Sequence, residues 1–212
     1  TGHGPVIGFD ISERRIDELR RGYDRTDEIS AEKLAGSTLT LTADPDDIRG
    51  AGIYIVTVPT PVDDNNEPDL SPLHSACETV GAVMAKGAIV VFESTVYPGV
   101  TEDICGPALE RVSGLVCGQD FWLGYSPERI NPGDREHTVD RITKVVAGQT
   151  PEVAERLAGL YGAMTTGGVH VATDIRTAEA AKVIENAQRD INIAFVNEVA
   201  AICQRLDISC LL

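Results

Sequence analysis

Basic residues are scarce in this chain compared with acidic ones. The 212 residues include 18 Lys and Arg against 33 Asp and Glu, which gives a formal net charge of −15. Such an excess of negative charge repels polyanions such as DNA or an acidic membrane face on average, so we expect no nucleic-acid partner. A bound pyrophosphate is compatible with this charge, because local backbone N–H groups and a few arginines decide that contact.

The chain also lacks C-x-x-C pairs and clustered histidines. Its five cysteines are odd in number, and its four histidines are scattered without the spacing of metal ligands. We therefore predict no metal site, no disulfide framework and no catalytic histidine, with reduced thiols in a cytoplasm. Each cysteine is interpreted as a small core residue rather than a nucleophile. The cysteines are Cys77, Cys105, Cys117, Cys203 and Cys210.

Long apolar runs are absent as well. No stretch approaches the roughly 20 apolar residues that a membrane helix needs, so we expect no membrane span. The N-terminus has no basic stretch followed by an apolar core, and it therefore does not resemble a signal peptide. The missing initiator Met suggests processing or truncation.

Short apolar runs alternate with amphipathic stretches, a pattern typical of an α/β protein with a parallel sheet. The predicted strands are 6–10, 39–42, 53–58, 88–92, 121–125, 143–147 and 169–172. Helical stretches are predicted after Ser12, over 46–50, from Ser71, over 101–112 and over 151–164. The predicted fold class is therefore α/β, a Rossmann-like doubly wound parallel sheet followed by a long helix.

That long helix is predicted from Asp174 onward, where the sequence contains no Gly or Pro. Apolar residues recur there at helical spacing, which indicates about 30 helical residues with a length of about 45 Å. A helix of this length is too long merely to cover the sheet. We expect it to link domains or to build a subunit interface.

Polar residues follow four of the predicted strands. Ligands of doubly wound sheets bind where the strands end, so these positions are candidates for a site. They are Asp10, the turn 58–61, the segment 93–95 and the turn 126–129. Asp10 stands where a carboxylate would accept the ribose hydroxyls of NAD. Taken alone, an acid before a helix is more often a cap or turn residue, and no glycine-rich turn precedes Asp10.

Lys182 and Asn186 lie four residues apart on the long helix, with Arg189 close to one turn further on, so they share a face. Together these side chains could donate several hydrogen bonds to an oxyanion or a phosphate. From spacing alone, a solvated and salt-bridged helix face is the better explanation of these residues.

Five motifs, taken in order, resemble the UDP-glucose/GDP-mannose dehydrogenase family. They are VIGFD at 6–10, IVTVPTP at 55–61, ESTVYPG at 93–99, YSPERINPGD at 125–134 and EAAKVIENAQRDINIA at 179–194. The resemblance covers nearly the whole chain. It implies an NAD-dependent, two-step oxidation of the C6 alcohol of a nucleotide sugar to a carboxylate, through a thiohemiacetal and a thioester on a cysteine.

The sequence of the fourth motif is similar to that in the branch of the family that oxidises UDP-N-acetylhexosamines for surface polysaccharides. Within this branch, UDP-N-acetylglucosamine is the favoured substrate. UDP-glucose enzymes usually have a second glutamate where this chain has Pro132. The alternatives are UDP-N-acetylmannosamine, UDP-N-acetylgalactosamine, UDP-glucose or GDP-mannose as substrate, or a catalytically dead scaffold that dimerises.

The resemblance also implies roles for individual residues. The catalytic set is Thr95, Glu128, Lys182 and Asn186, in which the lysine and asparagine stabilise a developing oxyanion. The cofactor-binding set is Asp10, Val58, Pro59, Thr60, Glu93, Ser94 and Thr95. The substrate-binding set is Glu128, Arg129, Lys182, Asn186 and Arg189.

The family's glycine-rich first turn, nucleophilic cysteine segment and UDP-binding domain do not occur in this sequence. We therefore expect residues 1–173 to be an NAD-binding Rossmann-like domain without its first strand, and residues 174–212 to begin a central dimerisation region. A homodimer through the long helix is expected. This polypeptide by itself is expected to be inactive.

Overall fold

Strands and helices alternate along the part of the chain that the computed structural model describes, residues 5–27, 29–128 and 142–209. The strands are β1 (Ile7–Phe9), β2 (Thr40–Thr42), β3 (Ile53–Val56), β4 (Ile89–Phe92), β5 (Trp122–Tyr125), β6 (Lys144–Gly148) and β7 (Val169–Val171). The helices are α1 (Glu13–Arg20), α2 (Ala31–Ala35), η1 (Pro45–Ile48), α3 (Ser71–Val83), η2 (Val100–Cys105), α4 (Gly106–Ser113), α5 (Pro151–Gly162) and α6 (Ile175–Arg205).

The predicted elements are confirmed, with two local differences. The short helix α2 was not predicted, because it has no apolar periodicity and is held by its Ser30 cap. The helix predicted over 101–112 begins as a π-helical turn, η2. Pro107 has no N–H to donate to the carbonyl four residues earlier, so regular α-helical bonding cannot run unbroken through this segment.

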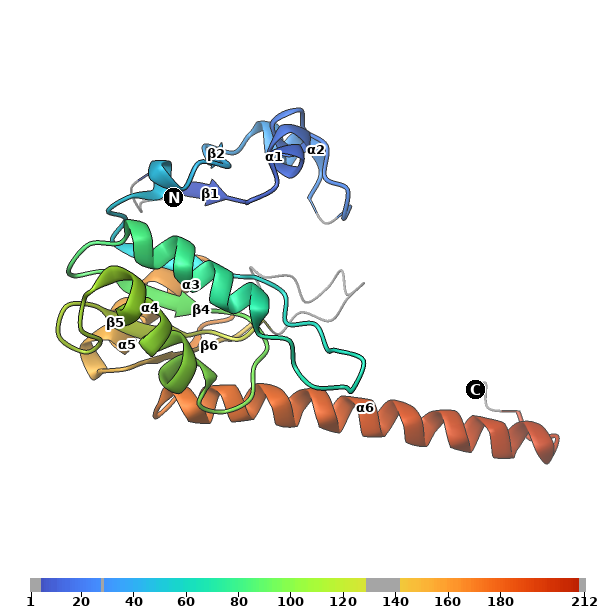
Figure 1. The fold of residues 1–212 in the computed structure, drawn as a ribbon. Coiled ribbons are helices and arrows are strands. Elements are labelled where there is room, and N and C mark those ends of the chain that lie inside the picture. Colours follow the sequence, from blue (N-terminus) through green and yellow to red (C-terminus); the bar gives the residue numbers. More distant parts are fainter. Residues whose placement is uncertain (1–4, 28, 129–141, 210–212) are drawn as a thin grey trace.

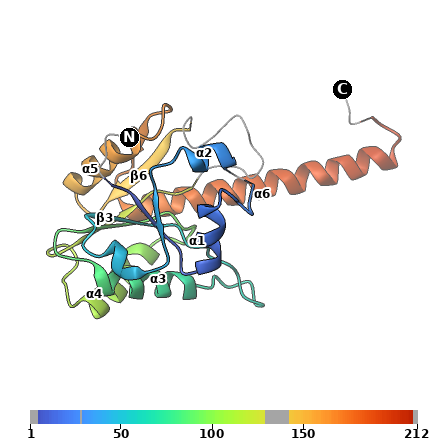
Figure 2. The ribbon, with the colours of Figure 1, turned by 90° about the horizontal axis from the view of Figure 1, so that it is seen from above.

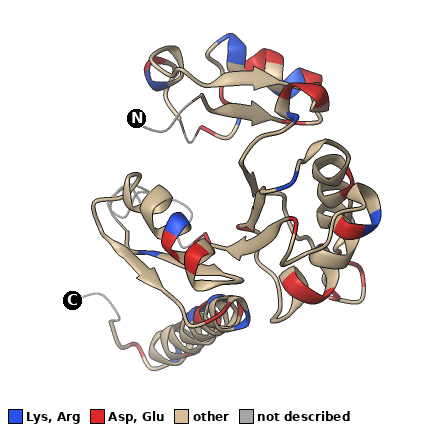
Figure 3. Ribbon diagram, turned by 90° about the vertical axis from the view of Figure 1, so that its left-hand side faces the viewer, with Lys and Arg blue, Asp and Glu red and all other residues tan. Residues whose placement is uncertain are grey.

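The strands form two sheets rather than one. β1 pairs with β2 in parallel, and the larger sheet has the order β3-β4-β5-β6-β7. Every pair in the larger sheet is parallel except β5 with β6, which is antiparallel. The small sheet, with α1 and α2, lies to one side of the main body (Figures 1 and 3). The predicted α/β class is confirmed, but the sheet is divided and mixed.

Strand β4 shows how the main sheet is buried on both faces. Val90 and Phe92 contact the core beneath α3 and α4, whereas Ile89 and Val91 contact the core beneath α5. Successive side chains of a strand point to opposite faces, so a strand covered on both sides is apolar throughout. This explains the unbroken run IVVF, in which no residue is more than 2% exposed.

The long helix α6 has 31 residues, as its sequence predicted. Asp174 caps its first turn by accepting a hydrogen bond from the backbone N–H of Thr177, at 2.7 Å. One face of the first turns is buried against the sheet, whereas every residue from Ala187 to Leu206 except Arg189 and Cys203 is exposed. The helix therefore runs out past the body of the molecule (Figures 1 and 2). Among the described residues, no helix is both long enough and apolar enough to cross a membrane.

The junction of β6 and α5 is too tight for any side chain at Gly148. A Cβ atom there would lie 2.4 Å from the backbone nitrogen of Ala154. We expect Gly148→Ala to lower the free energy of unfolding by about 1–3 kcal/mol, because backbone atoms must move to admit the methyl group. The control is Gly159→Ala in α5, where a Cβ meets nothing within 4 Å. That change should stabilise the protein by up to about 1 kcal/mol. Urea unfolding measures both; equal stability of the two variants would contradict the prediction.

Candidate functional site

The carboxyl ends of β3, β4 and β5 are joined by hydrogen bonds from one strand end to the next. The hydroxyl Oγ of Ser94 donates to the carbonyl oxygen of Val58 at 2.5 Å. The buried phenol of Tyr125 donates to the carbonyl oxygen of Ser94 at 3.1 Å. The segment after β4 is therefore held from both sides, and two of the predicted cofactor-binding residues, Val58 and Ser94, are in direct contact.

Glu93 also lies in this segment, and its side chain is turned toward the second face of the sheet. Its Oε1 accepts a hydrogen bond from the phenol of Tyr161 at 2.5 Å, and its Oε2 lies 3.6 Å from Nζ of Lys144. Burial raises the pKa of the Tyr161 phenol well above its usual range, and the nearby Glu93 carboxylate raises it further. Tyr161 is therefore a hydrogen-bond donor rather than a phenolate.

Four other predicted residues lie at these strand ends. Thr95 is exposed, and Pro59 is exposed on the turn after β3. The hydroxyl oxygen of Thr60 is buried and has no hydrogen-bond partner within the described part of the chain. Glu128 is half-buried after β5. A polar group without a partner at a strand end fits a ligand that supplies one. Arg129 lies outside the described residues.

A buried carboxylate attaches the start of α6 to the turn that follows this segment. Glu179 is fully buried, and it accepts hydrogen bonds from the backbone N–H groups of Gly99 and Thr101 at 2.6 and 2.9 Å. Arg176, one turn earlier, contacts the Asp103 carboxylate at 2.7 Å. These contacts set both the position and the rotation of the helix on the sheet.

Lys182 follows Glu179 by three residues and is only 6% exposed, so it shares the buried face of α6. Helix α6 contacts both β5 and β6. An interpretation of this lysine as part of a solvated helix face is therefore wrong. Glu179, Lys182 and Asn186 occupy successive turns along one side of the helix.

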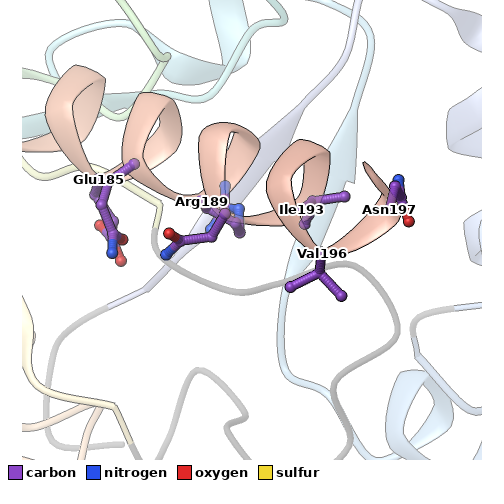
Figure 4. A pocket seen from close by; sticks show the side chains of 7 residues that line it. Glu185, Arg189, Ile193, Val196 and Asn197 are labelled. Atoms are coloured by element: carbon purple, nitrogen blue, oxygen red, sulfur yellow. The ribbon is translucent and has the colours of Figure 1, made fainter. Parts of the chain in front are cut away.

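Asn186 and Arg189 lie further along, where the helix leaves the body. The guanidinium of Arg189 donates to the amide oxygen of Asn186 at 2.6 Å. Arg189 lines an open groove beside α6, and the lining residues in the described part of the chain all belong to that helix (Figure 4). The groove is shallow rather than enclosed, because no second element of the described chain closes it.

Asp10 stands at the end of β1, in the small sheet. Its Oδ1 accepts a hydrogen bond from the backbone N–H of Ser12 at 2.8 Å. One carboxylate oxygen of Asp10 therefore caps the turn, as the interpretation of Asp10 as a turn residue predicted. Its role toward a cofactor stays a prediction. The arrows of β1 and β4 point the same way in Figure 1, so these two strands end on the same side of the molecule.

The surroundings of Cys105 and Cys117 activate neither thiol as a nucleophile. Cys77 and Cys105 are buried, and Cys117 and Cys203 are half-buried. The neighbouring thiol of Cys77 raises the pKa of Cys105, as does burial. Burial likewise raises the pKa of Cys117. Both are therefore held as thiols rather than as the thiolates that attack carbonyl groups. Within the described ranges, no group of three His, Cys, Asp or Glu side chains could hold a metal ion.

Sequence reasoning did not single out three residues of this region. Glu179 was within a recognised motif, and its spacing from Lys182 was the available signal. Lys144 and Tyr161 carried no signal, because they are far from Glu93 in the sequence and only the antiparallel β6 and the helix α5 bring them to it.

Parallel strands with polar residues gathered at their carboxyl ends, followed by a long helix, define the Rossmann-like dinucleotide-binding class. Residues 2–165 match the model of the UDP-glucose/GDP-mannose dehydrogenase family's NAD binding domain, and residues 176–211 match that of its central domain. The chain belongs to the UDP-glucose/GDP-mannose dehydrogenase family, as its motifs predicted.

Individual relatives agree with this membership. The chain is 58% identical to Protein CapL of Staphylococcus aureus and 54% identical to a UDP-N-acetyl-D-glucosamine 6-dehydrogenase of Pseudomonas aeruginosa, each over 96% of this chain and 48% of the relative. The solved UDP-N-acetyl-D-mannosamine dehydrogenase of Pyrococcus horikoshii superposes with a TM-score of 0.86 at 33% identity, over 96% of this chain and 49% of that one. The chain thus spans about half the length of these relatives.

We expect Glu179→Ala to destabilise the protein by about 2–4 kcal/mol, because two buried N–H groups lose their shared charged acceptor. The control is Glu198→Ala on the exposed part of the same helix, which should change the free energy of unfolding by less than about 0.5 kcal/mol. Denaturant unfolding at constant pH compares them. A Glu179 variant as stable as the Glu198 variant would show that α6 is not attached through this carboxylate.

Proposed function

We propose that the protein containing this chain is an NAD-dependent nucleotide-sugar 6-dehydrogenase that oxidises the C6 alcohol of a UDP-N-acetylhexosamine to a carboxylate. The observation that carries the proposal is the buried position of Lys182 on the face of α6 that Glu179 holds against the sheet. An ammonium held on this buried face is in a position to act on negative charge that develops during a reaction.

We propose that NAD binds along the carboxyl ends of the strands. Asp10 would hold the adenosine ribose, and the turn Val58–Thr60 with Ser94 and Thr95 would line the remainder. Two observations support this fit: the buried hydroxyl of Thr60 has no hydrogen-bond partner among the described residues, and Pro59 and Thr95 are exposed. NAD would accept a hydride from C6 in each oxidation step.

A glycine-rich strand and turn would complete this cofactor site, and the divided sheet suggests its place. β1 and β3 are edge strands of their two sheets. The apolar side chains of Ile7 and Ile55 on these strands are 38% and 42% exposed. A further parallel strand between them would join the two sheets and cover these side chains. We therefore propose residues 1–173 as a nucleotide-binding domain completed by such a strand, with residues 174–212 opening a central region.

For the chemistry, we propose that Lys182 and Asn186 stabilise negative charge that develops on the C6 oxygen. An ammonium and an amide directed at such charge act strongly in a site that excludes water. Thr95 would position a water molecule, and Glu128 would transfer protons. Arg129 and Arg189, with Glu128, Lys182 and Asn186, would contact the substrate.

UDP-N-acetylglucosamine is the substrate we favour. This chain is 54% identical to a UDP-N-acetyl-D-glucosamine 6-dehydrogenase, against 33% for a UDP-N-acetyl-D-mannosamine dehydrogenase. Such a uronic acid would serve surface-polysaccharide synthesis in the cytoplasm, where NAD and reduced thiols coexist. The alternative substrates are UDP-N-acetylmannosamine, UDP-N-acetylgalactosamine, UDP-glucose and GDP-mannose.

The test of this function is turnover by a longer version that extends beyond both ends of this chain. We expect NADH production with UDP-N-acetylglucosamine and slower production with the other four sugars. The 212-residue chain alone is expected to give none. Lys182→Met in the longer version should lower kcat about 10²- to 10³-fold, as loss of an oxyanion-stabilising donor does. The control, Lys86→Met, removes a lysine that is 74% exposed. A longer version that binds NAD but oxidises none of the sugars would favour another activity.

We also propose that the protein is a homodimer assembled through α6. Beyond the body, this helix exposes large apolar side chains at intervals of seven and four residues. They are Ile184, Ile191, Phe195, Ile202 and Leu206, which are 54–67% exposed. An apolar stripe of this kind on a free helix is covered by another helix in most proteins.

Replacing Phe195 with Glu should convert the dimer to a monomer, because a charge would be buried at the centre of the stripe. Light scattering measures the mass at a concentration where the unaltered protein is dimeric. Asp190→Gln on the same helix is the control and should remain dimeric. If the Phe195→Glu protein is still a dimer, the interface lies elsewhere. A dimer that never binds NAD would favour the scaffold alternative over the enzyme.

A further inference from the structure

The carboxylate of Glu93 contacts two side chains, one from β6 and one from α5. Its Oε1 accepts from the phenol of Tyr161 at 2.5 Å, and its Oε2 lies 3.6 Å from Nζ of Lys144. The Glu93 side chain is 13% exposed and the Lys144 side chain 3%. Little of the carboxylate is therefore left for a ligand in solution to reach.

Lys144 and Tyr161 also contact each other. The ammonium of Lys144 lies 5.3 Å from the centre of the Tyr161 ring, which places the cation over the ring face. Tyr161 is fully buried in the core between α5 and the sheet. A buried ammonium is tolerated only when it is paired, so Glu93, Lys144 and Tyr161 depend on one another.

This cluster anchors the residue that immediately precedes the Ser94–Thr95 dipeptide. The backbone N–H of Glu93 donates to the carbonyl of Val56 at 2.9 Å. Ser94 is held by Val58 and Tyr125, as described above. Thr95 is exposed at the strand end and directly follows Glu93 and Ser94, whose side chains are both held by hydrogen bonds.

We propose that Glu93, Lys144 and Tyr161 form a positioning cluster that fixes the backbone leading to Thr95, and that Glu93 does not contact the cofactor. The part of this inference that concerns Thr95 rests on the proposed function. The anchoring itself rests only on the contacts of the three side chains. Glu93, Lys144 and Tyr161 are accordingly positioning residues, because they act through Thr95.

The test uses the longer protein with Tyr161→Phe, Glu93→Gln and both changes together. The matched control is Tyr54→Phe. Tyr54 is a buried tyrosine near the start of β3, away from the strand ends that carry Glu93, and its phenol donates to the carbonyl of Ile48 at 2.9 Å. Three quantities are compared: amide hydrogen exchange of residues 93–97, the dissociation constant of NAD, and kcat.

We expect exchange of residues 93–97 to be at least about tenfold faster in Tyr161→Phe than in Tyr54→Phe, because a hydrogen bond to a charged group is lost. We expect kcat to fall about 10- to 100-fold through misplacement of Thr95. NAD affinity should stay within about twofold, and the double variant should be no worse than the poorer single variant, because the two side chains act as one unit.

Two results would overturn the inference. Weaker NAD binding in Glu93→Gln with unchanged exchange would make Glu93 a cofactor ligand. Exchange and kcat equal to those of the Tyr54 control would make the cluster an ordinary part of the core. If the unaltered protein oxidises no nucleotide sugar, the proposed function fails, but the exchange measurement still decides the anchoring.

Discussion

The buried carboxylate of Glu179 determines where the long helix lies on the sheet. It accepts two backbone N–H groups from the turn after β4, at 2.6 and 2.9 Å. A carboxylate without those donors would be too costly to bury, so helix and turn are ordered together. The rotation that results places Lys182 on the buried face. It also leaves the later turns of α6 directed past the body of the molecule (Figure 1).

A second set of contacts does the same for the strand ends. Val58, Ser94 and Tyr125 join three neighbouring strands through hydrogen bonds, and Glu93 joins them to β6 and α5. Polar groups held in this way are ordered before any ligand arrives. A reaction site built on them would not have to organise its backbone at the moment of reaction.

The strands are divided between two sheets that do not pair with each other in the described residues. β1 and β2 carry Asp10 at their carboxyl edge, yet no described strand pairs them with β3. The open edges of β1 and β3 leave apolar side chains exposed, which is unusual for parallel strands. The strand end at Asp10 and the buried face of α6 at Lys182 therefore depend on different parts of the molecule.

Apart from the short helix α2 and the π-helical turn η2, the order and type of the elements were determined by the sequence alone. Alternating apolar runs, proline and glycine positions and the unbroken stretch after Asp174 depend on local periodicity, which needs no tertiary contact. The sequence also indicated the strand ends and the spacing of Lys182 and Asn186. Only the tertiary structure decided that β6 runs antiparallel to β5, that the sheet divides after β2, and that Glu93 faces Tyr161, which is 68 residues away. Strand pairing and buried ion pairs join residues distant in the chain, and their free energies depend on burial that no local pattern encodes.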